Sequence, residues 1–276
     1  GDPDRYEILT FEGAFHGRST GAIAAAGSEK MVKGFGPLMP GFRQLPWGDM
    51  EALKAAISDR TAAVMLEPVQ GEGGIRPLPD ADLAAIRALC DQTGALLVLD
   101  EVQSGMGRTG KLFAHEYAGI TPDIMMIAKG IGGGFPLGAV VATEKAAAGM
   151  VAGTHGSTYG GNPLACAVGA KVMEIIAQPE FLAEVNRKAA LFRQKLEGLV
   201  AAHPEVFETV RGQGLMLGLK CKVAPGDLVN AGYAERILTV AAADNTLRLL
   251  PPLTISDAEI AEAVARLDRA AGRLDG

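Results

Sequence analysis

The sequence has few cysteines, no long apolar run and no excess of positive charge. Its three cysteines, Cys90, Cys166 and Cys221, lie inside apolar helical or strand patterns. This number and setting argue against a disulfide framework or a zinc site and predict reduced core residues of a cytoplasmic protein. No segment approaches the length of a membrane span. The net charge of −6 argues against a surface for nucleic acids or anionic membranes.

The chain also lacks an initiator methionine. It begins with Gly1 and enters an expected strand, residues 6–11, almost at once. We therefore expect a piece of a longer protein that starts within a domain. With 276 residues, 48% of them hydrophobic and 21% charged, the chain is long enough for one large domain and a smaller one.

Two short apolar runs, residues 95–99 and 124–128, each lead into a residue that can take part in chemistry. The first run is followed by Asp100 and Glu101, and the second by Lys129. Runs of this length, bounded by turn signals, predict strands buried on both faces, as in a parallel sheet. Ligands of open α/β sheets bind outside the carboxyl ends of the strands, so Asp100 and Lys129 are expected at that rim.

An aspartate and a lysine at strand ends have two interpretations. They can form an ordinary ion pair that faces water, and the spacing alone slightly favours this. Alternatively, a buried carboxylate can keep a ring nitrogen protonated, and a partly desolvated lysine can act as a nucleophile. Pyridoxal phosphate needs both groups.

Glycines 130, 132, 133 and 134 follow Lys129 closely. They lack the Lys-Ser/Thr ending of a Walker loop and the spacing of a Rossmann loop, so we exclude both nucleotide-binding motifs. We expect them to let the backbone fold tightly around Lys129.

His16 follows the first expected strand. A lone histidine could be a metal ligand or a base, but no partner stands at ligand spacing. We therefore interpret His16 as a polar contact.

Strand and helix patterns alternate through the first 177 residues, which predicts a mostly parallel sheet flanked by helices. The strands expected besides those above are 62–66 and 138–143, the helices are 49–58, 82–93 and 163–177, and 28–46 is expected to be a surface loop. Beyond residue 178 the expected helices are 181–202, 228–243 and a last one capped by Ser256, and the strands are 214–221 and 246–250. The fold class is therefore α/β, with a large domain, 1–177, and a smaller C-terminal α+β domain, 178–276.

The sequence around these residues resembles that of the class-III, fold-type I aminotransferases. Asp100 stands in LDEVQSGMGRTG and Lys129 in IMMIAKGIGGGFPLGA; further matching segments are FHGR, MPGFRQLPWGD, QGEGGIRPLP and HGSTYGGNPLACAVG. The resemblance extends over nearly the whole chain. It implies pyridoxal 5'-phosphate as cofactor and no metal, with Lys129 as the lysine that forms the Schiff base and Asp100 as the partner of the ring nitrogen.

The resemblance assigns five more residues to the cofactor. Phe15 and Val102 would sandwich its ring, Gln103 would bind its phenolic oxygen, and Glu101 belongs to the same strand end. Thr158 would reach the cofactor phosphate of another subunit, which implies a homodimer with active sites shared across the interface.

Four residues are assigned to the substrate in the same way. Arg18 would hold a substrate carboxylate, because a guanidinium matches a carboxylate with two parallel hydrogen bonds. Ser157 would lie near the substrate, and Glu72 would pair with Arg248. Without the resemblance, Arg248 would be an ordinary surface residue of a strand. Ser19 stands where such families usually carry Thr.

The implied reaction is transamination between a small amino donor and 2-oxoglutarate. Taken together, these sequence motifs are most similar to those of the branch that uses N-acetylornithine, in arginine synthesis. Branches that use ornithine, succinylornithine, succinyldiaminopimelate or 4-aminobutyrate share most of the motifs, and a non-catalytic fragment is a further alternative. The family's Ser-Gly-Thr-Glu type segment, in which a helix N-terminus binds the cofactor phosphate, is not found. The N-terminal part of the family fold is therefore expected to be absent from this chain.

Overall fold

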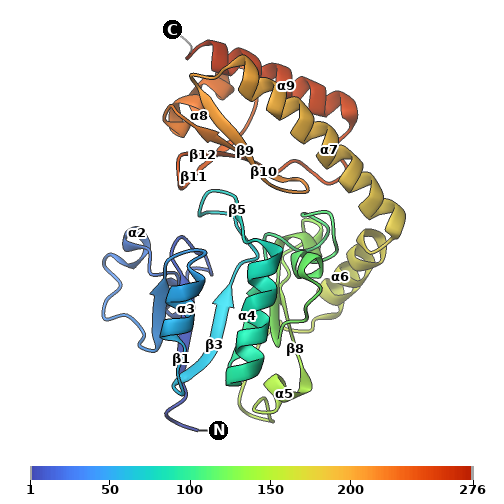
Figure 1. The fold of residues 1–276 in the computed structure, drawn as a ribbon. Coiled ribbons are helices and arrows are strands. Elements are labelled where there is room, and N and C mark those ends of the chain that lie inside the picture. The colour runs from blue at the N-terminus through green and yellow to red at the C-terminus, as the bar shows by residue number, and fades with distance from the viewer. Residues whose placement is uncertain (1, 275–276) are drawn as a thin grey trace. The chain divides into compact units, whose positions relative to one another are not determined.

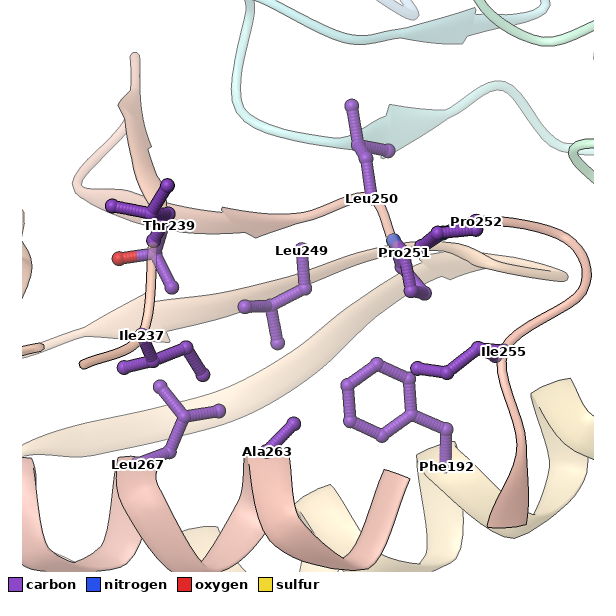
Figure 2. A pocket seen from close by; sticks show the side chains of 11 residues that line it. Phe192, Ile237, Thr239, Leu249, Leu250, Pro251, Pro252, Ile255, Ala263 and Leu267 are labelled. Carbon is purple, nitrogen blue, oxygen red and sulfur yellow. The ribbon is translucent and has the colours of Figure 1, made fainter. Parts of the chain in front are cut away.

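The computed structural model describes residues 2–274 and divides the chain into two compact units (Figure 1). Unit 1 comprises residues up to Pro68, Leu78–Met106 and Phe113–Ile176. Unit 2 comprises Val69–Pro77, Gly107–Leu112 and the residues from Ala177 onward. The expected boundary, at residue 177, had not assigned the two short inner segments to the C-terminal unit.

Unit 1 is built on a six-stranded sheet in the order β2-β1-β3-β6-β7-β8. Its strands are β1 (Glu7–Phe11), β2 (Phe42–Leu45), β3 (Thr61–Leu66), β6 (Leu96–Asp100), β7 (Ile124–Ile127) and β8 (Ala139–Ala142). All neighbours pair in parallel except β8, which is antiparallel to β7. The expected parallel sheet is therefore present, and its central strands end at one common edge.

Helices and short turns connect these strands. They are α1 (Thr20–Ala26), α2 (Glu29–Val32), α3 (Met50–Ala56), α4 (Asp80–Thr93), η1 (Ala114–Ala118), η2 (Lys129–Gly132), α5 (Glu144–Ala147) and α6 (Pro163–Ile176). Asp49 caps α3 as expected, accepting a hydrogen bond of 2.8 Å from the amide of Ala52. Gly94 ends α4 with φ of 70°, the left-handed conformation that glycine adopts without strain.

The segment 28–46 is not the plain loop that its glycines and prolines predicted. It contains α2 and β2, and β2 pairs in parallel with β1 from Phe42 to Leu45. Of the strand's residues only Leu45 is buried, because β2 is at the edge of the sheet. An edge strand with one buried side chain leaves little apolar signal in the sequence.

Unit 2 combines an antiparallel sheet, in the order β11-β12-β10-β9, with three helices. The strands are β9 (Phe207–Gln213), β10 (Met216–Cys221), β11 (Val240–Ala242) and β12 (Thr246–Leu249); the helices are α7 (Pro179–Ala202), α8 (Pro225–Ala234) and α9 (Asp257–Gly272). A two-stranded hairpin, β4 (Val69–Gln70) and β5 (Arg76–Pro77), completes the unit. The core is formed by the helices and one face of the sheet, with Phe192, Leu196, Leu217, Leu219 and Leu267 all buried.

One expectation for unit 2 was wrong in extent, and one strand was missed. The helix expected over 228–243 ends at Ala234, and the last residues of that segment form β11, which pairs with β12. The strand β9 had not been expected. The capping box of α9 is confirmed: Ser256 accepts from the amide of Glu259, and Glu259 accepts from the amide of Ser256 at 2.7 Å.

The three cysteines are free, and two lie in the cores. Burial raises the pKa of Cys90 to about 12 and that of Cys221 to about 11, so both thiols stay protonated. Cys166 on α6 is exposed, which corrects the expectation that it is a core residue.

Across residues 2–274, every helix is too short or too polar to cross a membrane. In the same part of the chain, His, Cys, Asp and Glu side chains do not gather in a group of three or more that could hold a metal ion.

Candidate active site

Asp100 and Lys129 lie at the ends of neighbouring parallel strands. Asp100 is the last residue of β6 and is paired in register with Met126 of β7; Lys129 follows the end of β7 and opens the turn η2. Asp100 is 5% exposed, whereas Lys129 is an exposed residue. The structure therefore brings both to the carboxyl edge of the sheet, as the two apolar runs predicted.

The backbone at Lys129 is strained. Its φ of 48° lies in the left-handed region, which costs a residue other than glycine roughly 1–2 kcal/mol. The neighbouring glycines allow a close approach, since a Cβ atom at Gly130 would lie 2.8 Å from Cβ of Met106. At Gly133 it would lie 2.8 Å from Cγ2 of Val172. The chain therefore packs closely just after the lysine, and strain of the kind seen at Lys129 often marks functional sites.

Two groups hold the Asp100 carboxylate. Its Oδ1 accepts from the amide of Val102 at 3.1 Å, and its Oδ2 lies 2.9 Å from Nδ1 of His16. The His16 side chain is fully buried, and its second ring nitrogen, Nε2, has no hydrogen-bond partner within residues 2–274. His16 is thus a polar contact, as interpreted. Its partner is the acid at the strand end, so His16 belongs to the site.

Glu101 is buried beside Asp100 and accepts hydrogen bonds from the segment that follows β6. Its carboxylate accepts from Ser104 Oγ at 2.5 Å and from the amides of Ala114 and His115 at 3.1 and 2.9 Å. Nδ1 of His115 lies 3.1 Å from the same carboxylate. Both oxygens are therefore engaged by the protein itself, and the assignment of Glu101 to the cofactor gains no support from these contacts.

Phe15 and Arg18 lie close together after β1. The guanidinium carbon of Arg18 is 5.5 Å from the centroid of the Phe15 ring, a cation–π distance. The amide of Phe15 donates to Glu67 Oε2 at 3.1 Å. Glu67 is buried directly after β3, whose last residue is paired with Leu99. Glu67 had not been assigned a role, although its position after a strand matches that of Asp100.

Four predicted residues lie in loops of unit 1. Val102 and Gln103 are half-buried in the turn after β6. Ser157 and Thr158 are exposed in the segment before α6, and Ser157 Oγ accepts from the amide of Gly160 at 2.9 Å.

Glu72 and Arg248, 176 positions apart in the sequence, form an ion pair within unit 2. Glu72 is in the turn of the β4–β5 hairpin, and Arg248 is on β12. The Arg248 side chain is 12% exposed and the Glu72 side chain 42%. The expected contact is present, and the roles given to the two residues stay predictions.

Comparison with known proteins decides the family. The family model described as "Aminotransferase class-III" matches residues 1–271. The chain belongs to the class-III aminotransferases. It is 70% identical to the acetylornithine aminotransferase of Rhodobacter capsulatus over 275 residues, which are 100% of this chain and 70% of that protein.

Two solved structures show the same fold. The N-acetylornithine aminotransferase of Stenotrophomonas maltophilia has a TM-score of 0.83 at 38% identity and is matched over 99% of this chain and 67% of that one. The ornithine aminotransferase of Toxoplasma gondii, described with partial occupancy of PLP at its active site, has a TM-score of 0.92 at 30% identity, over 98% and 65%. The chain thus spans about two thirds of the length of these proteins.

Class-III aminotransferases work with pyridoxal phosphate, and the residues at the sheet edge fit this cofactor. A buried carboxylate, supported by a buried histidine, suits a protonated ring nitrogen. The amine of Lys129 and the aromatic ring of Phe15 lie in the same unit, after strands of the same sheet. His16 Nε2 is a buried polar atom that has no hydrogen-bond partner among residues 2–274.

Proposed function

We propose that the protein transfers the amino group of N-acetylornithine to 2-oxoglutarate, yielding N-acetylglutamate semialdehyde and glutamate, in arginine biosynthesis. The observation that carries this proposal is the 70% identity over the whole chain to an acetylornithine aminotransferase. The enzyme acts in the cytoplasm, where both substrates are small charged metabolites.

When bound, pyridoxal phosphate supplies an electron sink for the carbon that carries the amino group. Lys129 would hold the cofactor through its side-chain amine, and the same amine would carry the proton at that carbon. Asp100 would keep the pyridine nitrogen protonated, and His16 holds the Asp100 carboxylate in place. Phe15 and Val102 would hold the ring of the cofactor between them, and Gln103 would donate to its phenolic oxygen.

Charged side chains carry the proposed substrate recognition. Arg18 binds a carboxylate of either substrate, and Ser157 lies near the reacting group. The donor has one carboxylate, far from the carbon that reacts. 2-Oxoglutarate has two carboxylates, one of them next to the carbon that reacts. Glu72 therefore pairs with Arg248 when the donor is bound and releases it for the second carboxylate of 2-oxoglutarate. The pairing lowers the cost of a partly buried guanidinium.

A homodimer completes this proposal. Thr158 reaches the cofactor phosphate of the other subunit from the segment that precedes α6. Apolar side chains in and near this segment are exposed, among them Val151, Tyr159 and Leu164, and exposed apolar side chains in one region are typical of an interaction surface.

Ornithine is the second candidate donor. The observation that favours it is the TM-score of 0.92 to an ornithine aminotransferase. A shared fold at 30% identity does not fix the donor, so N-acetylornithine is the stronger candidate.

Half-reaction kinetics of the full-length enzyme test the proposed donor. Each of N-acetylornithine, ornithine, N-succinylornithine and 4-aminobutyrate is mixed with the holoenzyme, and the loss of the cofactor's visible absorbance is followed. We expect the highest kcat/KM for N-acetylornithine. A higher value for ornithine would transfer the assignment to the second candidate.

The role of Glu72 is tested by Glu72→Ala. Arg248 is then available throughout, so the half-reaction with glutamate is favoured over that with the ω-amino donor by about tenfold. Equal slowing of both half-reactions would contradict the exchange of partners at Arg248. Glu116→Ala, which removes a carboxylate from the turn η1 of unit 1, is the matched control and leaves the ratio unchanged.

A further inference from the structure

Ile75 has a backbone conformation that its side chain disfavours. Its φ is 52°, in the left-handed region, and a β-branched residue there is a genuine outlier. The side chain is fully buried. A glycine would adopt this conformation without strain, so the surroundings of Ile75 must hold the isoleucine in place.

Two glycines of the antiparallel sheet form the seat of the Ile75 side chain. A Cβ atom at Gly212 of β9 would lie 2.8 Å from Ile75 Cγ2. At Gly218 of β10 it would lie 3.0 Å from Ile75 Cγ1. Because any side chain at either position would collide with Ile75, the isoleucine packs directly on the backbone of two neighbouring strands.

The seat lies next to Arg248. Gly218 is paired in register with Arg211 on one side and with Arg248 on the other, so the three residues form a row across β9, β10 and β12. Directly opposed residues share one face of a sheet. Ile75 therefore occupies the space above Gly218, between the positions of Arg211 and Arg248 on the neighbouring strands.

The same turn carries Glu72. The amides of Gly74 and Ile75 both donate to the carbonyl of Gly71, at 3.3 and 3.4 Å, which closes the turn around Glu72. The carbonyl of Glu72 accepts from the amide of Ala243, at 2.9 Å, in the turn between β11 and β12. The turn that carries Glu72 is thus held by the hydrogen bond from Ile75 to Gly71 and by the hydrogen bond from Ala243 to Glu72 itself.

We propose that Ile75 is a positioning residue that holds Glu72 against Arg248 and thereby sets the preference between the ω-amino donor and dicarboxylic substrates. The inference rests on the proposed role of the Glu72–Arg248 pair. Ile75 acts through Glu72: its seat on Gly212 and Gly218 fixes the hairpin turn on the sheet that carries Arg248. If the seat is loosened, Glu72 leaves Arg248 more often, and the guanidinium becomes available to a substrate carboxylate.

The test is a double-mutant cycle on the full-length holoenzyme, with Ile75→Ala, Glu72→Ala and the double variant. The measured quantity is the ratio of the half-reaction rate constant with N-acetylornithine to that with glutamate. We expect Ile75→Ala to lower this ratio by about threefold to tenfold, since small displacements of a positioned group have effects of this size. The double variant should match Glu72→Ala alone, because residues that act through one another are not additive.

Two further variants separate positioning from packing. Ile75→Val keeps the branched Cβ in the seat and should restore most of the ratio. Val69→Ala removes apolar volume from the same buried cluster, which Val69 shares with Ile75 and Met216, and should leave the ratio unchanged. Thermal unfolding of each variant reports any common loss of stability.

The outcomes separate the inference from the function it rests on. If Glu72→Ala leaves the ratio unchanged, the exchange of partners at Arg248 is wrong. If Glu72→Ala changes the ratio while Ile75→Ala does not, or if Val69→Ala acts like Ile75→Ala, the positioning role of Ile75 is wrong. The positioning role is also wrong if Ile75→Ala changes the ratio as much in the Glu72→Ala background as it does in the wild type.

Discussion

In unit 1 the carboxylates of Asp100 and Glu101 are buried and accept hydrogen bonds from amides, a hydroxyl and histidine rings. In unit 2, by contrast, the carboxylates of Glu72 and Asp244 pair with cationic side chains. The Glu72 and Asp244 side chains keep 42% and 40% of their surface exposed. A buried acceptor that loses its donors pays the full cost of desolvation, about 1–3 kcal/mol. A half-exposed ion pair contributes only about 0–1 kcal/mol and can be opened.

The difference separates two tasks. Groups that must stay fixed through every turnover belong among buried hydrogen bonds, and a group that must exchange partners belongs in a half-exposed ion pair. Unit 1 carries the residues proposed for the chemistry, and unit 2 carries the pair proposed to select the substrate. The four predictions below test this separation.

Lys129→Ala should have the largest effect. The variant loses both the cofactor-binding amine and the group that moves the proton, so we expect kcat to fall by about 10³-fold or more. The visible absorbance of the bound cofactor should be lost, while the circular dichroism of the fold is retained. Lys145→Ala, on the exposed helix α5, is the control and keeps full turnover. Normal activity of Lys129→Ala would remove the lysine from the mechanism.

Asp100→Asn should lower kcat by about 10²-fold, as for loss of a preorganised electrostatic contact. The amide keeps the shape of the side chain. Its oxygen can accept from Val102, and its NH₂ group can donate to Nδ1 of His16 in the other tautomer, so the unfolding temperature should change little. Stopped-flow absorbance and thermal unfolding measure the two quantities. A rate near that of the wild type would make Asp100 an ordinary acid at a strand end.

Glu101→Gln should lower stability more than kcat, which is the reverse of what we expect for Asp100→Asn. The amide NH₂ of glutamine would face donors that now meet a carboxylate oxygen, which costs about 1–3 kcal/mol of folding free energy. Urea unfolding measures that loss, and kcat of the folded fraction should change less than in Asp100→Asn. A large fall in kcat without a loss of stability would return Glu101 to the cofactor, as the family resemblance had implied.

The smallest effect concerns acid pH and Asp244. Hydrogen bonds from Lys220 and then Arg211 hold the pKa of the Asp244 carboxyl below its ordinary value. A carboxyl with a lowered folded-state pKa stabilises the protein above its unfolded pKa, about 4, and this contribution is lost as pH falls through the folded value. Because the side chain is 40% exposed, we expect this contribution to the free energy of unfolding to be at most about 1 kcal/mol.

Asp244→Asn is the matching variant, since asparagine also tolerates the φ of 50° at this position. Urea midpoints of wild type and variant should differ at pH 6, and the difference should begin to shrink as the pH falls below about 4. A difference that is unchanged at low pH would show that the carboxylate charge does not contribute.

The sequence predicted the parts of the fold that have a strong local signal. The runs that lead to Asp100 and Lys129 are apolar because β6 and β7 are central strands. The caps at Asp49 and Ser256 have side chains that are typical of a helix start. By contrast, β9 places mostly half-exposed residues along its length, and its pairing with β10 is a tertiary property.

Other features depended on contacts that no local pattern records. The segment after Ala234 continues a helical composition, but Arg236 turns the chain with φ of 57° and leads into β11. The contact between His16 and Asp100 spans 84 positions, and spacing along the chain cannot reveal it. The Glu72–Arg248 pair was expected only through the family resemblance.

Unit 2 is discontinuous in the sequence, and this limits how the protein can be recombined with its relatives. Ile75 rests on Gly212 and Gly218, and Arg108 donates to the carbonyls of Leu215 and Pro251 at 3.1 and 2.6 Å. A chimera that exchanges only the residues from Ala177 onward would therefore set a foreign sheet against the resident hairpin and loop. The unit that can be exchanged between two such enzymes includes the segments Val69–Pro77 and Gly107–Leu112.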